Sequence, residues 1–143
     1  MKKILIFIFI MVLVGSGCKK ATVQDGDLLK TKWTLSCIQD TKTGAITNYP
    51  SDEKNKISIV FTDSLNVISI SGICNGCTGT YSYSFPNGEI NIVILGCTQV
   101  ACKYDEWEGY TTQNLNTAFN YKINGNNLAI YSNGAYNLYF NQN

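Results

Sequence analysis

Histidine and arginine are both absent from the 143-residue sequence, and each absence excludes a class of function. Without histidine the chain can form neither a Ser-His-Asp triad nor a Cys-His pair, nor a zinc site with a histidine ligand. All eleven basic residues are lysines, and they face ten acidic residues. With no basic surplus and no guanidinium group, nucleic acid is not an expected partner.

The N-terminus has the pattern of an export signal. Lys2 and Lys3 give it a positive start, and Ile4 to Val14 is an unbroken apolar run of eleven residues. That run is too short to cross a bilayer core of ~30 Å as a helix, which needs about 20 residues. Gly15-Ser16-Gly17 then precedes Cys18, an arrangement that resembles the lipobox of bacterial lipoproteins, in which the cysteine is acylated and the chain is cut just before it.

We therefore expect residues 1–17 to be a lipoprotein signal peptide, Cys18 to carry the lipid, and residues 18–27 to form a flexible tether. An ordinary secretory signal with an incidental cysteine is the alternative. Lys19 and Lys20 follow Cys18, where an acidic stretch would favour export to the surface. The expected location is thus the bacterial cell envelope, with the lipid in the outer membrane, which would be the protein's membrane partner, and the domain facing the periplasm.

The rest of the chain alternates apolar and polar residues in short runs separated by turn residues, the pattern of an all-β fold. The clearest pair of runs, 81–85 and 90–94, is joined by Pro86-Asn87-Gly88, and Asn-Gly suits a tight hairpin. The other expected strands are 33–37, 45–49, 57–61, 67–73, 128–131 and 135–140.

One segment, residues 104–118, has helical spacing instead, with Trp107, Tyr110, Asn114, Leu115 and Ala118 on one side. Asp105, Glu106 and Glu108 fall in its first turn, where carboxylates suit the helix dipole. We expect these carboxylates to face solvent rather than to form an acid-base site. The fold class is therefore mainly β: a small curved antiparallel sheet or partly closed barrel of seven to eight strands, with one helix inserted before the last strands.

Five cysteines follow Cys18, namely Cys37, Cys74, Cys77, Cys97 and Cys102. Disulfides are favoured in an exported chain because it meets an oxidising compartment, and the odd number leaves at least one thiol over. A thioredoxin-like centre at Cys74-Asn75-Gly76-Cys77 would need a helix after it, whereas a strand is expected there. A zinc site from Cys74, Cys77, Cys97 and Cys102 is another alternative, although Cys97 and Cys102 are spaced more widely than in a typical zinc knuckle. The last alternative is that the cysteines are buried and reduced, with no bond or metal.

The motifs around these cysteines resemble those of the META domain family, the HslJ-like domains of bacterial envelope proteins. Gly72, Cys74-Asn75 and Gly79-Thr80-Tyr81 reproduce one family motif, and Thr98-Gln99-Val100-Ala101-Cys102 reproduces a second with Val in place of Met. Glu108, Leu115 and the segment 121–130 fit the family's later positions, and 29–35 resembles its start. The resemblance covers roughly residues 28–140, and the domain is therefore expected to span 28–143, nearly the whole of the expected mature chain.

This resemblance implies a strongly curved sheet or partly closed barrel with one helix, and a disulfide between Cys74 and Cys102. Cys77 and Cys97 are additional to the family motifs, and their proximity to the motif cysteines makes a second disulfide possible, with Cys37 left over. From the residues themselves we expect a non-catalytic domain with no cofactor and no metal.

For function, the sequence favours a lipid-anchored, non-catalytic envelope module that binds a small molecule, peptide or protein partner, or supports envelope stress tolerance. A purely structural envelope lipoprotein is the main alternative, and a thiol oxidoreductase using Cys74 and Cys77 is a weaker one.

Overall fold

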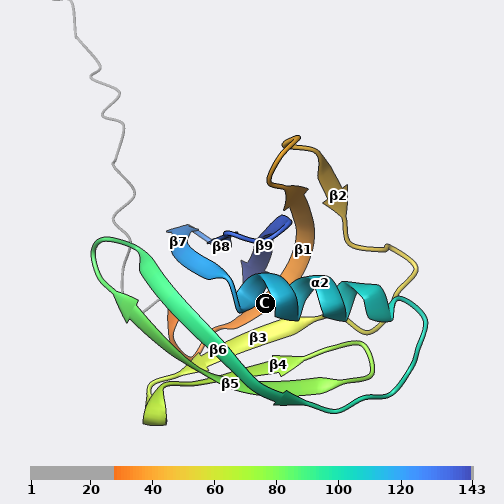
Figure 1. The fold of residues 1–143 in the computed structure, drawn as a ribbon, viewed down its shortest axis with the longest axis horizontal. Helices are drawn as coiled ribbons and strands as arrows, with labels where there is room; N and C mark the ends of the chain where they lie inside the picture. Colours follow the sequence, from red (N-terminus) through yellow and green to blue (C-terminus); the bar gives the residue numbers. More distant parts are fainter. Residues whose placement is uncertain (1–27, 143) are drawn as a thin grey trace, which may run out of the picture.

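The computed structural model describes residues 28–142 and is shown in Figure 1. In chain order the elements are β1 (Lys32–Asp40), β2 (Ile46–Asn48), β3 (Ser58–Thr62), the 3-10 helix η1 (Ser64–Asn66), β4 (Val67–Ser71), β5 (Gly76–Ser84), β6 (Glu89–Cys97), α2 (Asp105–Leu115), β7 (Ala118–Asn124), β8 (Asn127–Ser132) and β9 (Tyr136–Gln142).

Eight of the strands close into an antiparallel barrel. From β3 to β9 each strand pairs with the next, and β1 pairs with β3 on one side and with β9 on the other. The remaining strand, β2, lies outside this ring and pairs with the second half of β1. The expected mainly β fold with one helix before the last strands is confirmed, and the barrel is closed rather than partly open.

The barrel interior is filled by the apolar residues that alternate along the strands. Because successive side chains of a strand point to opposite faces, every second residue can enter the core. Ile59, Phe61, Ile68, Leu128 and Ile130 have no exposed surface at all. The two-residue period in the sequence therefore directly describes the inner wall of the barrel.

The seam between β6 and β7 is the weakest part of the ring. In the described chain these strands share one paired position, Glu89 opposite Asn120, flanked by a bond from the Tyr121 N–H to the Gly88 carbonyl. Helix α2 lies against β6, β8 and β9, and Figure 1 shows it crossing between β3–β6 and β7–β9. The buried side chains of Trp107 and Leu115 hold it there.

Strand β7 is not among the expected strands, and the expected helix, residues 104–118, is too long at its C-terminal end. The helix ends at Leu115, and the strand begins at Ala118 with an irregularity in its pairing to β8. This bulge places Ala118 and Tyr121, three positions apart, on the buried side, which breaks the two-residue period at the strand's start. The expected strand 67–73 is also shorter and ends at Ser71.

Candidate functional site

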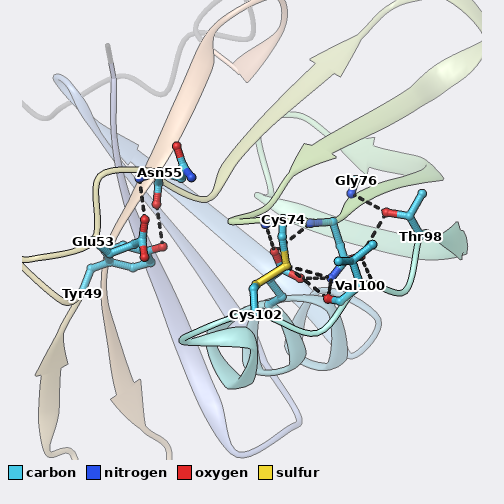
Figure 2. Close-up of a disulfide and its surroundings, with 10 residues drawn as sticks. Tyr49, Glu53, Asn55, Cys74, Gly76, Thr98, Val100 and Cys102 are labelled. Atoms are coloured by element: carbon cyan, nitrogen blue, oxygen red, sulfur yellow. Dashed lines mark hydrogen bonds between the residues drawn. A yellow bond between two sulfur atoms is a disulfide. The ribbon is translucent and has the colours of Figure 1, made fainter.

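Two disulfides lie where α2 approaches the hairpin of β5 and β6. Cys74, in the turn before β5, is bonded to Cys102, in the segment before α2 (Figure 2). Cys77 and Cys97 are opposite each other on β5 and β6 and are bonded across the hairpin. Cys37 on β1 is a half-buried free thiol. Cys74 and Cys77 thus belong to different disulfides, and the residues after Cys74 continue into a strand.

Asn75, next to Cys74, links the turn to the segment that follows β6. Its side-chain nitrogen donates to the Val100 carbonyl (2.9 Å), and its side-chain oxygen accepts from the Val100 N–H (2.7 Å) and the Thr98 hydroxyl (3.1 Å). The Gly76 N–H in turn donates to the Thr98 hydroxyl, as Figure 2 shows. This one amide therefore holds residues 98–100 against the start of β5, close to both disulfides.

Glu108 reaches from α2 into the same turn. One carboxylate oxygen accepts the N–H groups of Cys74 (2.8 Å) and Asn75 (3.0 Å), and the other accepts from the Asn75 side chain (2.6 Å). The expectation that all three first-turn carboxylates face solvent is wrong for Glu108, although Asp105 and Glu106 are exposed. Hydrogen bonds to a charged carboxylate are strong, so three N–H donors from one turn hold the Glu108 side chain against that turn instead of in solvent.

Gly72 is required by this close approach. A Cβ atom at this position would overlap the Glu108 carboxylate and the Asn75 carbonyl oxygen. Gly72 and Cys74-Asn75 of the first motif lie against Glu108, and the Asn75 side chain joins them to Thr98 and Val100 of the second motif. The residues of both motifs, Gly72, Cys74-Asn75 and Thr98 to Cys102, thus form one hydrogen-bonded corner with Glu108. We call this set the Glu108 corner.

Ionisation of Glu108 is favoured by these donors. Burial raises the pKa of the carboxyl group, but the N–H groups of Cys74 and Asn75 and the Asn75 side chain outweigh burial and hold the pKa below its usual range. Glu108 is therefore a fixed anion in the folded protein at neutral pH.

Replacing Glu108 with glutamine is expected to destabilise the fold by about 1–2 kcal/mol at neutral pH, since charge-assisted bonds to the turn are lost in a half-exposed site. Because the folded pKa is below the unfolded value, this contribution is present above the ordinary Glu pKa of ~4.3 and is lost as pH falls through the folded pKa. Urea denaturation of wild type and Glu108→Gln at several pH values between 7 and 3 should show the difference shrink. Glu106→Gln, an equal charge change on the exposed side of α2, is the control. A difference that stays constant with pH would contradict this.

An open groove of about 540 Å³ lies beside the Glu108 corner. One wall is the segment after β6, where the Val100 side chain is 56% exposed, and the other is the first turns of α2. The exposed carboxylates of Asp105 and Glu106 line it, and Gly109 leaves the helix surface bare. The groove combines an apolar rim with negative charge, so it can accept a ligand that carries both apolar and basic groups.

The segment between Cys102 and α2 is held at its far side by the loop after β2. The Tyr104 hydroxyl donates to Asp52 (2.6 Å), and Lys103 forms a salt bridge with the same carboxylate (3.0 Å). Tyr104 has a left-handed backbone with φ of 67°, at the position just before the helix. These contacts and the Cys74–Cys102 disulfide together fix the position and the direction in which α2 begins.

The sequence identified the cysteines of this site and flagged Asn75 and Glu108 as motif residues, but not their contact. The structure also brings the Sγ atoms of Cys74 and Cys102 and a Glu108 carboxylate oxygen within 4.8 Å of one another. The four cysteines do not gather as a zinc site, because they are divided between two disulfides. Residues 1–27, with Cys18, lie outside the described residues. In the part that is described, no helix is long and apolar enough to cross a membrane.

These features define a small disulfide-bonded β-barrel with one helix packed over its weakest seam. A family model for the META domain matches residues 26–143, and the chain belongs to this family. No curated protein matches the chain.

Solved structures share the fold. A solution NMR structure of a protein from Burkholderia xenovorans is similar with a TM-score of 0.65 and 20% identity, over 82% of this chain and 85% of that one. The crystal structure of a DUF4847 family protein from Bacteroides vulgatus is similar with a TM-score of 0.62 and 14% identity, over 82% and 96% of the two chains. At these identities the likeness concerns the fold alone.

Proposed function

We propose that this protein is a lipid-anchored, non-catalytic module of the bacterial cell envelope that binds an extended peptide segment of a protein partner. The observation that carries the proposal is the open groove between residues 97–101 and α2, whose wall is fixed by two disulfides and the Asn75 amide. A wall fixed in this way loses little conformational freedom when a ligand binds, which favours affinity.

The shape and chemistry of the groove favour a peptide over a small molecule. Small ligands bind in enclosures that bury most of their surface, whereas this groove is open along one side. Val100 and Ala101 offer an apolar rim, and Asp105 and Glu106 offer exposed carboxylates. A segment with an apolar residue next to Lys or Arg would match both walls.

A redox function has less support. Thiol oxidoreductases exchange a disulfide within one Cys-x-x-Cys pair at the start of a helix. Here Cys74 and Cys77 are bonded to different partners, and β5 begins between them at Gly76. The Cys-x-x-Cys sequence is accounted for by two structural disulfides.

The anchor is tested by metabolic labelling of the full chain in a bacterial host. Labelled palmitate should enter the wild type and be absent from Cys18→Ala, and inhibition of signal peptidase II by globomycin should make the precursor accumulate. An unlabelled wild-type protein that is released in soluble form from the periplasm would contradict the anchor.

Binding in the groove is tested by a photo-reactive residue in place of Val100. We expect cross-linking to a specific envelope partner, and none from the same residue in place of Leu65, which is 87% exposed on η1. Glu106→Lys should greatly reduce the cross-link at position 100, whereas Glu89→Lys, the same charge change outside the groove, should not. Equal cross-linking from both positions, or none from either, would favour the purely structural alternative.

A further inference from the structure

The Glu108 corner holds three potential metal ligands of complementary chemistry. The sulfur atoms of Cys74 and Cys102 and a carboxylate oxygen of Glu108 lie within 4.8 Å of one another, and all three residues are half-buried. As the disulfide stands, the sulfur atoms have no charge to offer a cation. Reduction changes this, because thiolates are strong ligands for thiophilic cations such as Zn²⁺.

We propose that reduction of the Cys74–Cys102 disulfide creates a Zn²⁺ site, with the two thiolates and the Glu108 carboxylate as ligands. A dithiol protein donates two electrons and two protons, so the S–S bond breaks, two thiols form, and the dithiol becomes a disulfide. Zn²⁺ then binds as both thiols release their protons. The site goes beyond the peptide groove and does not depend on it.

The contacts around the corner keep the ligands together once the disulfide is open. Glu108 is held by backbone and amide N–H groups of Cys74 and Asn75, not by either sulfur atom. Asn75 also binds both backbone groups of Val100, two residues before Cys102. The separate Cys77–Cys97 disulfide fixes the two strands on either side. Opening one bond therefore leaves the two thiols facing each other across a fixed frame.

The distances required by zinc are within reach of these residues. In a tetrahedral site with Zn–S bonds of ~2.3 Å, two sulfur ligands are about 3.8 Å apart. The Cα atoms of Cys74 and Cys102 are 6.5 Å apart, and neither residue lies in a helix or strand, so rotation of two side chains provides this separation. With three protein ligands, the fourth position is left for water, which can enter because all three residues are partly exposed.

The hydrogen bonds to Glu108 have a second role in this site. Donors to a ligating carboxylate orient it and offset the negative charge of the ligand set, as second-shell groups do in zinc proteins. Two thiolates and a carboxylate carry three negative charges against two positive charges on zinc. The N–H groups of Cys74 and Asn75 donate to the Glu108 carboxylate and so offset the one excess negative charge.

The test uses the full chain in detergent, treated with a limiting amount of a metal-free phosphine and mixed with Zn²⁺. The chains used are those in which mass spectrometry shows the Cys74–Cys102 bond open and the Cys77–Cys97 bond intact. We expect one Zn²⁺ per reduced chain and none per oxidised chain. Alkylation mapped by mass spectrometry should be slowed about tenfold or more by Zn²⁺ at Cys74 and Cys102, but not at the free thiol of Cys37. Co²⁺ in place of Zn²⁺ should give the absorption of a tetrahedral site with two thiolates.

Glu108→Gln should weaken Zn²⁺ binding by about tenfold or more, and Glu89→Gln, an exposed carboxylate on β6, should leave it unchanged. The proposal is overturned if the reduced chain binds no Zn²⁺, or if Zn²⁺ protects Cys37 as well as it protects Cys74 and Cys102. It is also overturned if Glu108→Gln binds as tightly as wild type, or if reduction abolishes the β-sheet signal in circular dichroism so that no folded site exists.

Discussion

Replacing all four bonded cysteines with alanine is expected to lower the free energy of unfolding by about 6 kcal/mol. The two disulfides are nested, since Cys77 and Cys97 are 20 residues apart and lie inside the 28-residue span from Cys74 to Cys102. The inner bond alone closes a loop worth about 3.3 kcal/mol in the chain-entropy estimate. Once it is formed, the outer bond closes only about eight further residues, worth about 2.5 kcal/mol.

Nesting makes the effect of each disulfide depend on the other. Cys74→Ala with Cys102→Ala should cost about 2.5 kcal/mol, and Cys77→Ala with Cys97→Ala about 2 kcal/mol. Against a net stability of ~5–15 kcal/mol, the loss of both bonds removes between about two fifths and all of the free energy of unfolding.

Guanidinium denaturation of the three variants, followed by tryptophan fluorescence, measures these losses. Cys37→Ala is the control, because Cys37 is a free, half-buried thiol, and we expect a loss of about 1 kcal/mol or less. Peptide mapping of thiol-blocked protein under non-reducing conditions should recover the Cys74–Cys102 and Cys77–Cys97 linkages. A Cys74–Cys77 linkage would contradict the structural role of the bonds and restore the redox hypothesis.

The barrel could be predicted from the sequence because its signal is local. Strands such as β3 and β8 show their two-residue period within five or six residues, and the turn at Asn87-Gly88 marks the hairpin between β5 and β6. Closure of the ring could not be predicted, because it depends on pairing between β1 and β9 across about a hundred residues. No local pattern encodes such a partner.

The polar residues of the site could not be placed for the same reason, since their partners are far away in the sequence. Three carboxylates at the start of a helix have one expected role near the helix dipole, and sequence spacing does not distinguish them. Glu108 differs from Asp105 and Glu106 because the Cys74–Asn75 turn, more than thirty residues earlier, presents N–H groups to it. The signal that could have found this contact was the Gly72 of the motif, which is needed only if another group packs against the turn.

Asn114 is a second such case, and its replacement by alanine is expected to cost about 3 kcal/mol. The helical spacing places Asn114 on the same side of α2 as the apolar residues, and its side chain is indeed buried, with 2% exposed, but its role is polar. Its side-chain oxygen accepts the Tyr136 N–H (2.9 Å) and the Ser132 hydroxyl (3.1 Å), and its nitrogen donates to the Tyr110 carbonyl (2.7 Å).

The large loss of stability in Asn114→Ala follows from the backbone and side-chain groups that lose their hydrogen bonds to the missing amide. Without the amide, the first N–H of β9 loses its acceptor, and an unsatisfied buried group costs about 1–3 kcal/mol. The Ser132 hydroxyl at the end of β8 keeps the Tyr136 carbonyl as its acceptor but loses its link to α2. A cavity left by the side chain adds to this. Since β9 is the strand that closes the barrel onto β1, the loss is felt at the closure itself.

Chemical denaturation of Asn114→Ala gives the global loss, and hydrogen exchange locates it. The Tyr136 amide should exchange faster in the variant than in wild type, whereas amides in the middle of β4, which has no contact with this residue, should change only by the global amount. Gln113→Ala, its exposed neighbour on α2, should be within about 0.5 kcal/mol of wild type. If Asn114→Ala were equally close to wild type, the amide would not be what joins α2 to the closing hairpin, and the buried contacts of Trp107 and Leu115 would be sufficient to hold the helix.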